Sequence, residues 1–212
     1  MQNNGLFSVN GRAGHNKTAR LVLLALLSAL TIIFTFFMIP VGPFELTLAA
    51  IPVAVGAILL GPAASTFLGF LFGMCSFITC FGISSLGVLL LAENAFFTFL
   101  VCVPTRMLMG FLVGWIFRLL MPRFEHIPAF PITVTAFAAA VLNTIFFVST
   151  LILLFWNGKT ITDLMQNAGV TSVIGLIGVF ITLNAVVEAA VSMVIGAGLS
   201  GVLLYASKAK RS

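Results

Sequence analysis

The sequence predicts an all-α integral membrane protein with six transmembrane helices and almost no soluble domain. Of its 212 residues, 61% are hydrophobic and only 7% are charged, and the mean hydropathy is +1.23. A soluble globular domain carries about 25% charged residues, so this chain lacks the polar groups to cover a water-facing surface. Each crossing of the hydrocarbon core takes about 20 residues. The length therefore fits a single membrane domain made almost entirely of spans.

Composition divides the chain into three parts. We expect residues 1–17 to be a flexible polar tail, residues 18–207 to be the six-helix transmembrane domain, and residues 208–212 to be a short basic tail. Long uncharged stretches within the domain mark the spans. The predicted spans cover, in order, residues 21–39, 46–60, 63–80, 94–120, 132–156 and 171–205.

Proline and glycine mark the ends of several predicted spans. Residues 40–43 read Pro-Val-Gly-Pro and end the first span, and Gly61-Pro62 marks the turn between the second and third. Residues 81–87 hold two Gly and two Ser, and residues 157–169 are polar. We expect both of these segments to be loops.

The basic residues predict the orientation in the membrane. Cytoplasmic loops carry an excess of Lys and Arg, and the ten such residues lie mainly in three clusters at the ends of apolar runs. We therefore expect both termini and the connector between the fourth and fifth spans to be cytoplasmic, with no nucleic-acid partner despite the net charge of +5. The clusters are Arg12, Lys17 and Arg20; Arg118 and Arg123; and Lys208, Lys210 and Arg211.

Two ionisable side chains fall deep inside predicted spans. A charge at the centre of a membrane helix costs about 2.5–3.5 kcal/mol on insertion scales. Arg106 precedes Arg118 by 12 residues, or about 18 Å of helix, and Glu188 is similarly deep. Two interpretations stay open: Arg106 binds an anionic substrate in a cavity, or Arg106 and Glu188 pair and lock two helices together.

Buried amides and outer polar residues extend the candidate site. Asn143 and Asn184 fall within the fifth and sixth spans, and an unpaired amide in hydrocarbon costs several kcal/mol. Interhelical hydrogen bonding and substrate contact would each provide a partner. Asn184 shares a helix face with Glu188, four residues later. The polar residues expected near the external face, around a cavity mouth, are Glu45, Thr47, Glu93, Asn94 and Trp156.

The sequence contains none of the motifs that would indicate catalysis or ATP hydrolysis. It has no Walker A sequence, no HExxH and no GxSxG. His15 and His126 lie outside the predicted spans, and Cys75, Cys80 and Cys102 lie in apolar segments, as expected for small packing residues. We therefore predict that the protein is not an enzyme and has no catalytic residues, metal site or cofactor. Uphill transport would need an ion gradient or a partner.

Small residues spaced four apart recur along the chain and permit close approach between helices. The pairs are Ala25 and Ala29, Gly69 and Gly73, and Gly110 and Gly114.

These features, in this order, resemble the substrate-binding S component of an energy-coupling factor (ECF) transporter, a vitamin importer of prokaryotes. The resemblance covers about residues 18–206 and rests on Ala25-Leu-Leu-Ser-Ala29, the stretch from Ala50 to Pro62, Gly69-Phe-Leu-Phe-Gly73 and Asn184-Ala-Val-Val-Glu188. It implies a six-helix bundle in the cell membrane, working with a transmembrane coupling subunit and two ATP-binding cassette ATPases. It also implies that Ala25 and Ala29 dock on the coupling subunit.

Shorter fragments are most similar to the pantothenate-type members of that family. They are Cys80-Phe-Gly-Ile-Ser84, the stretch from Cys102 to Gly110, and the stretch from Leu142 to Phe147. The resemblance implies pantothenate as the substrate, and its carboxylate, amide and hydroxyls would suit Arg106, Asn143 and Asn184. Riboflavin and folate are the alternative vitamins. The remaining candidate contacts are Asn94, Thr47 and Trp156.

Two other classes of protein stay open: a stand-alone secondary carrier or channel, and an intramembrane enzyme. A stand-alone secondary carrier or channel is expected to show an internal repeat, and none is evident between the two halves. An intramembrane enzyme is expected to show paired acidic residues or histidine clusters near one face, and the predicted spans contain neither.

Overall fold

The structure is a computed structural model that describes residues 17–41, 44–124, 127, 129–156, 158–167, 169–172, 175 and 178. Nearly all of the predicted sixth span lies outside the described residues, together with Asn184, Glu188 and almost all of both predicted tails. The side chains of residues 39–46, among them Glu45, are also outside the description.

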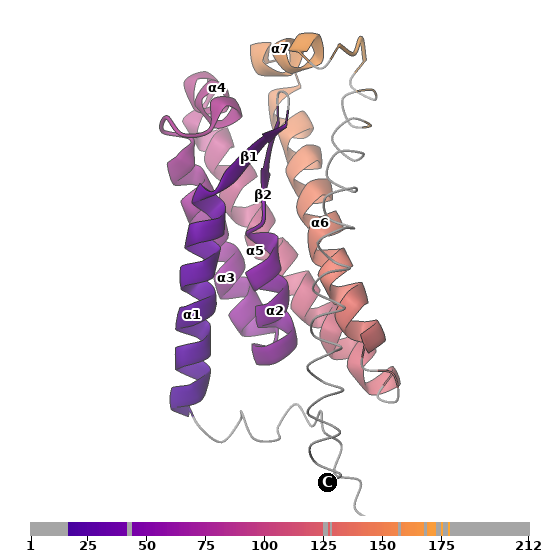
Figure 1. Cartoon of the computed structure of the whole chain (residues 1–212). Helices are drawn as coiled ribbons and strands as arrows, with labels where there is room; N and C mark the ends of the chain where they lie inside the picture. Colours follow the sequence, from indigo (N-terminus) through magenta and orange to yellow (C-terminus); the bar gives the residue numbers. More distant parts are fainter. Residues whose placement is uncertain are drawn as a thin grey trace, which may run out of the picture.

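The described chain is a bundle of helices that run along a common direction (Figure 1). Within the described part, four helices are long and apolar enough to cross a membrane, and α2 (Ala50–Leu60) is a shorter apolar helix. A single 3₁₀ turn, η1 (Met121–Arg123), follows α5. The four long helices are α1 (Lys17–Phe36), α3 (Pro62–Thr79), α5 (Ala95–Leu120) and α6 (Ala129–Phe155).

A β-hairpin joins α1 to α2, and it replaces the predicted end of the first span, the predicted break after it and the predicted start of the second span. Strands β1 (Met38–Val41) and β2 (Phe44–Thr47) pair antiparallel, and α2 starts at Ala50 rather than at residue 46. Pro40 and Pro43 are incompatible with a helix interior, and the β-branched and aromatic residues around them favour strands. The 11 residues of α2 span about 16 Å, roughly half of the hydrocarbon core. Figure 1 shows the hairpin continuing the path of α2.

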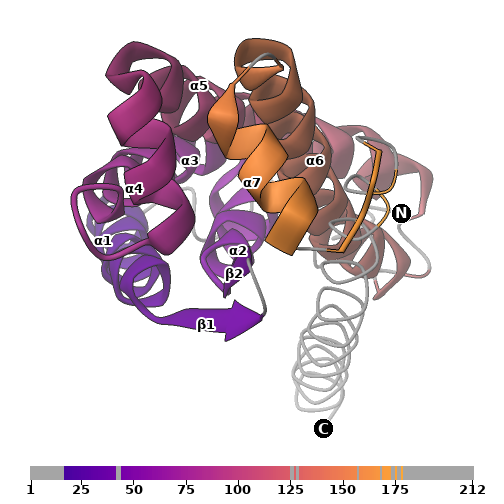
Figure 2. The same ribbon diagram turned by 90° about the horizontal axis from the view of Figure 1, so that it is seen from above.

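Two short helices cover the end of the bundle at which the hairpin lies (Figures 1 and 2). They are α4 (Ser85–Glu93) and α7 (Lys159–Asn167). The start of α4 and the whole of α7 were predicted as loop, and these predictions were wrong. Ser84 Oγ accepts a hydrogen bond from Gly87 N at 2.9 Å and caps α4. Residues 159–167 are mostly polar and were therefore predicted as a loop. They form a helix with one apolar face, on which Ile161 and Leu164 are buried against α4 and α6.

Helices α3 and α5 approach each other through glycines on both sides. A Cβ at Gly73 of α3 would lie 2.7 Å from Val103 Cα of α5, and one at Gly114 of α5 would lie 2.5 Å from Pro62 Cα of α3. Contacts this close exclude any side chain larger than hydrogen. Ser65 Oγ also donates to the Gly110 carbonyl at 2.7 Å. The predicted role of these glycines in close helix packing is confirmed within the chain.

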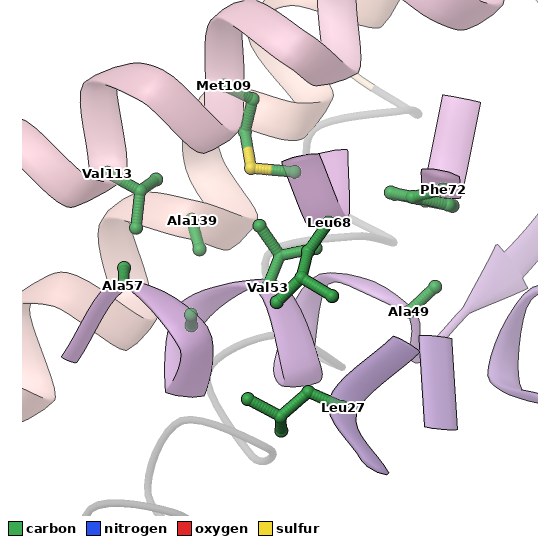
Figure 3. Packing of buried hydrophobic residues seen from close by; sticks show 10 residues of the cluster. Leu27, Ala49, Val53, Ala57, Leu68, Phe72, Met109, Val113 and Ala139 are labelled. Atoms are coloured by element: carbon green, nitrogen blue, oxygen red, sulfur yellow. The ribbon is translucent and has the colours of Figure 1, made fainter. Parts of the chain in front are cut away.

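The largest apolar cluster of buried residues joins α1, α2, α3, α5 and α6 (Figure 3). At the opposite end from α4 and α7, Arg20 Nη2 donates to the Leu60 carbonyl at 3.2 Å and ties α1 to the end of α2. The buried cluster consists of Leu27, Ala49, Val53, Ala54, Ala57, Leu68, Phe72, Met109, Val113 and Ala139.

Candidate functional site

Arg106 is the one buried charged side chain among the described residues, with 8% of its surface exposed. It lies in α5, two residues after Pro104, which has no N–H to contribute to the helix. Arg106 Nη1 donates to the carbonyl oxygens of Val101 at 3.3 Å and Cys102 at 3.1 Å. Thr105 Oγ1 also donates to the Val101 carbonyl. All three hydrogen bonds go to carbonyls of the turn of α5 that precedes Thr105 and Arg106.

Close packing against α3 holds the backbone of Arg106 in place. A Cβ at Gly69 would clash with the Arg106 carbonyl oxygen and would lie 3.1 Å from the carbonyl carbon. The absence of a side chain at Gly69 therefore allows α3 to lie against α5 at this level. The predicted small-residue packing thus positions the predicted functional arginine.

Two aromatic rings contact the Arg106 guanidinium group. Its Cζ lies 4.6 Å from the ring centroid of Phe72 in α3 and 5.4 Å from that of Phe147 in α6. Cations within about 6 Å of a ring centroid are attracted by the electron-rich face. Sequence reasoning did not identify either phenylalanine, because the residues lie on three different helices. The 22 phenylalanines of the chain also provide no local signal that distinguishes these two.

Two buried polar atoms have no hydrogen-bond partner among the described residues: Arg106 Nε, a donor, and Asn143 Oδ1, an acceptor. Asn143 precedes Phe147 by one turn of α6 and so shares its face. Asn143 therefore lies one turn from a residue whose ring contacts Arg106. An unpaired buried group costs about 1–3 kcal/mol. A ligand that carries an acceptor and a donor would satisfy both atoms.

Glu93 connects α4 to α7 at the end of the bundle that these two helices cover. Its Oε2 accepts from Thr160 N at 3.1 Å and from Thr160 Oγ1. This places a carboxylate at the N-terminus of α7, where the helix dipole favours negative charge. A Cβ at Gly158 would clash with the carboxylate. Glu93 thus has a local structural role at the position where the sequence predicted a cavity mouth.

Three other predicted contact residues lie toward the same end of the bundle, and none of them is buried. Asn94 Oδ1 caps α5 by accepting from Phe96 N at 3.0 Å and Phe97 N at 3.1 Å. Trp156 directly follows α6 and is 60% exposed. Thr47 ends β2 and is half-buried. These three residues lie at the ends of helices or strands, whereas Arg106 and Asn143 lie within α5 and α6.

Ala25 and Ala29, the predicted docking residues, are exposed on α1. The buried residues of this helix, Leu27, Thr31 and Thr35, form a separate stripe. The two threonine hydroxyls donate within the helix, to the carbonyls of Leu27 and Thr31. The alanines therefore lie on a different face of α1 from these buried residues.

The three cysteines are buried and unbridged. Cys80 Sγ lies 4.0 Å from Cys102 Sγ, in a small apolar cluster with Val103. Among the described residues there is no group of three or more His, Cys, Asp or Glu that could hold a metal ion.

A family model described as "ECF transporter, substrate-specific component" matches residues 19–196. No curated protein matches the chain.

Proposed function

Because the chain belongs to the family of ECF transporter substrate-specific components, we propose that it captures a water-soluble vitamin, pantothenate, on the external side of the cell membrane. The family is one of transporter components, not of enzymes. Four apolar helices in the described part agree with a multi-pass membrane protein. The family requires a substrate but does not specify which one, so the choice of vitamin depends on the site.

One observation carries the choice of pantothenate: the unpartnered pair Arg106 Nε and Asn143 Oδ1 inside the bundle. A carboxylate accepts hydrogen bonds from a guanidinium group with charge assistance, and an amide oxygen needs an N–H or O–H donor. Pantothenate carries a carboxylate, an amide N–H and two hydroxyls, so one molecule supplies both requirements. Asn184, Asn94, Thr47 and Trp156 remain proposed as further contacts.

Riboflavin and folate fit these two atoms less well. Riboflavin has no carboxylate to place against Arg106, and burying an arginine without an anionic partner is costly. Folate has carboxylates, but it also brings a large pterin ring that needs a wide apolar slot. A stand-alone secondary carrier is disfavoured, because the family match covers most of the chain.

We also propose that the chain works with an ECF coupling subunit and two ATP-binding cassette ATPases. The family functions with such partners, and this sequence has no Walker A motif of its own. Six crossings would place both termini in the cytoplasm, on the side of the basic residues of α1 and of the α5–α6 connector. The exposed pair Ala25 and Ala29 is the proposed docking site.

Isothermal titration of the purified protein with pantothenate, riboflavin and folate tests this proposal. We expect pantothenate to bind without ATP and without partner subunits, and the other two to bind much more weakly. Preferential binding of riboflavin or folate would overturn the choice of substrate while leaving the family assignment unaffected.

A further inference from the structure

The hydrogen bonds of Arg106 leave one edge of its guanidinium group available. Both backbone acceptors, Val101 and Cys102, bind Nη1. A guanidinium group is planar and carries five N–H donors. The Nε–H and one N–H of Nη2 point along another edge, and Nε has no acceptor among the described residues. This edge matches the two oxygens of a carboxylate.

The rings of Phe72 and Phe147 restrict how a ligand reaches that edge. The guanidinium carbon lies over both rings, so a ligand has to approach the guanidinium group from a side that neither ring occupies. Phe72 is fully buried in α3 and Phe147 is half-buried in α6, and both of these helices pack against α5. The two contacts, together with the carbonyl anchors, hold the arginine before substrate arrives. Preorganisation of this kind strengthens binding without adding contacts to the ligand.

Asn143 adds a second requirement to the same site. Its unpartnered atom is the acceptor Oδ1, and it lies one helical turn from Phe147. A substrate that offered only carboxylates would leave this oxygen unpaired. The site therefore selects an acid that also carries an N–H or O–H donor.

We propose that Phe72 and Phe147 are positioning residues that hold Arg106 so that its Nε edge receives the substrate carboxylate, while Asn143 Oδ1 accepts from a donor on the same substrate. This proposal rests on the proposed function and specifies how its site distinguishes an acid from a neutral analogue. The competing explanation is that the two phenylalanines only fill space in the core, where Phe72 belongs to the largest cluster.

The test compares pantothenate with panthenol, in which a CH₂OH group replaces the carboxylate and the rest of the molecule is unchanged. Affinities for both are measured by titration of the full-length protein carrying Phe72→Leu or Phe147→Leu. We expect the wild type to prefer the acid and each variant to reduce that preference on the order of 2- to 30-fold, with panthenol affinity nearly unchanged. Phe147→Tyr keeps a ring and is expected to restore the preference.

Two further variants separate the roles of the residues. Phe146→Leu removes a neighbouring ring of the core and is expected to leave the preference for the acid unchanged. Asn143→Leu is expected to weaken pantothenate and panthenol alike, because both carry the amide N–H and the two hydroxyls of the pantoyl part. If the Phe72 and Phe147 variants weaken acid and alcohol equally, the phenylalanines are packing residues and the proposal is wrong. A wild type that binds both ligands equally would overturn the role of the Arg106 edge as well.

A ligand-free measurement distinguishes failure of this proposal from failure of the proposed function. In protein labelled with ¹⁵N-arginine, the Arg106 Nε–H resonance is assigned by its loss in Arg106→Gln. Ring currents are expected to shift it, and the shift should shrink in Phe72→Leu and Phe147→Leu. A protein that binds neither ligand refutes pantothenate as the substrate, and the resonance then decides the positioning role by itself. An Nε–H signal that neither variant moves refutes that role.

Discussion

Arg106 has a buried donor atom that lowers the stability of the folded protein and that can also bind a substrate. Its Nη1 is paired with backbone carbonyls, while its Nε is buried without a partner among the described residues. Such an unpaired group lowers the stability of the substrate-free protein by about 1–3 kcal/mol. A carboxylate at Nε would remove this penalty on binding. Substrate binding at Arg106 is therefore expected to stabilise the bundle.

The change Arg106→Gln is expected to reduce pantothenate affinity roughly 10- to 150-fold, the value of a charge-assisted hydrogen bond, and to reduce panthenol affinity little. Titration of both ligands measures this. Arg118→Gln, at an exposed position of the same helix, is the matched control and should bind both ligands as the wild type does. If Arg106 instead serves only to pair with Glu188, Arg106→Gln and Glu188→Gln should both lower the melting temperature and affect the two ligands equally.

At the scale of helices, the contact between α3 and α5 determines where Arg106 lies. Glycines alternate across this contact, with Gly69 and Gly73 on α3 and Gly110 and Gly114 on α5. Association of helices in lipid depends on close van der Waals packing, because the apolar surroundings supply little hydrophobic drive. The interhelical hydrogen bond from Ser65 to Gly110 adds to this packing. A change in the spacing of α3 and α5 would therefore move the arginine and Phe72 together.

Substitution of Gly110 by alanine tests this packing. The added Cβ would clash with the Ser65 carbonyl oxygen and would lie 3.3 Å from Thr66 Cα, and overpacking of this kind costs about 1–3 kcal/mol. We expect Gly110→Ala to lower the melting temperature in detergent, and Leu108→Ala, at a position of α5 that is 47% exposed, to change it little. Equal melting temperatures for wild type and Gly110→Ala would mean that the two helices are not in close contact at this level.

The described part of the molecule has ends that differ in charge, and α1 has an exposed apolar face. Lys17 and Arg20 of α1 and Arg118 of α5 belong to the end opposite α4 and α7, whereas Glu93 and Asp163 belong to the end that these short helices cover. This distribution agrees with a cytoplasmic basic end. The face of α1 that carries Ala25 and Ala29 points away from the core. In the proposed complex, this face of α1 would be turned toward the coupling subunit.

The proposed docking face predicts that binding and assembly can be separated. Ala25→Trp and Ala29→Trp should bind pantothenate nearly as the wild type does, because both positions are exposed on α1 and distant in sequence from Arg106. Both should fail to co-purify with the coupling subunit, since a bulky ring holds the helices apart. Leu153→Trp, at a position of α6 that is 78% exposed, is the control and should still assemble. If binding, stability and assembly are lost together in the alanine variants, the docking face lies elsewhere.

The sequence by itself determined the membrane class, the approximate positions of four long apolar helices, the close packing of the glycines of α3 and α5 and the place of Arg106 inside a long helix. These features follow from local quantities, namely the length of apolar stretches, the position of charges and the spacing of small residues. The contacts of Arg106 with Phe72 and Phe147, the unpartnered oxygen of Asn143 and the helices α4 and α7 became evident only in the tertiary structure. Each of these features depends on surfaces from helices that are far apart in the sequence. Helix α7 is a polar nine-residue segment too short to be stable alone, and it is helical because Glu93 caps it and a buried apolar cluster receives its inner face.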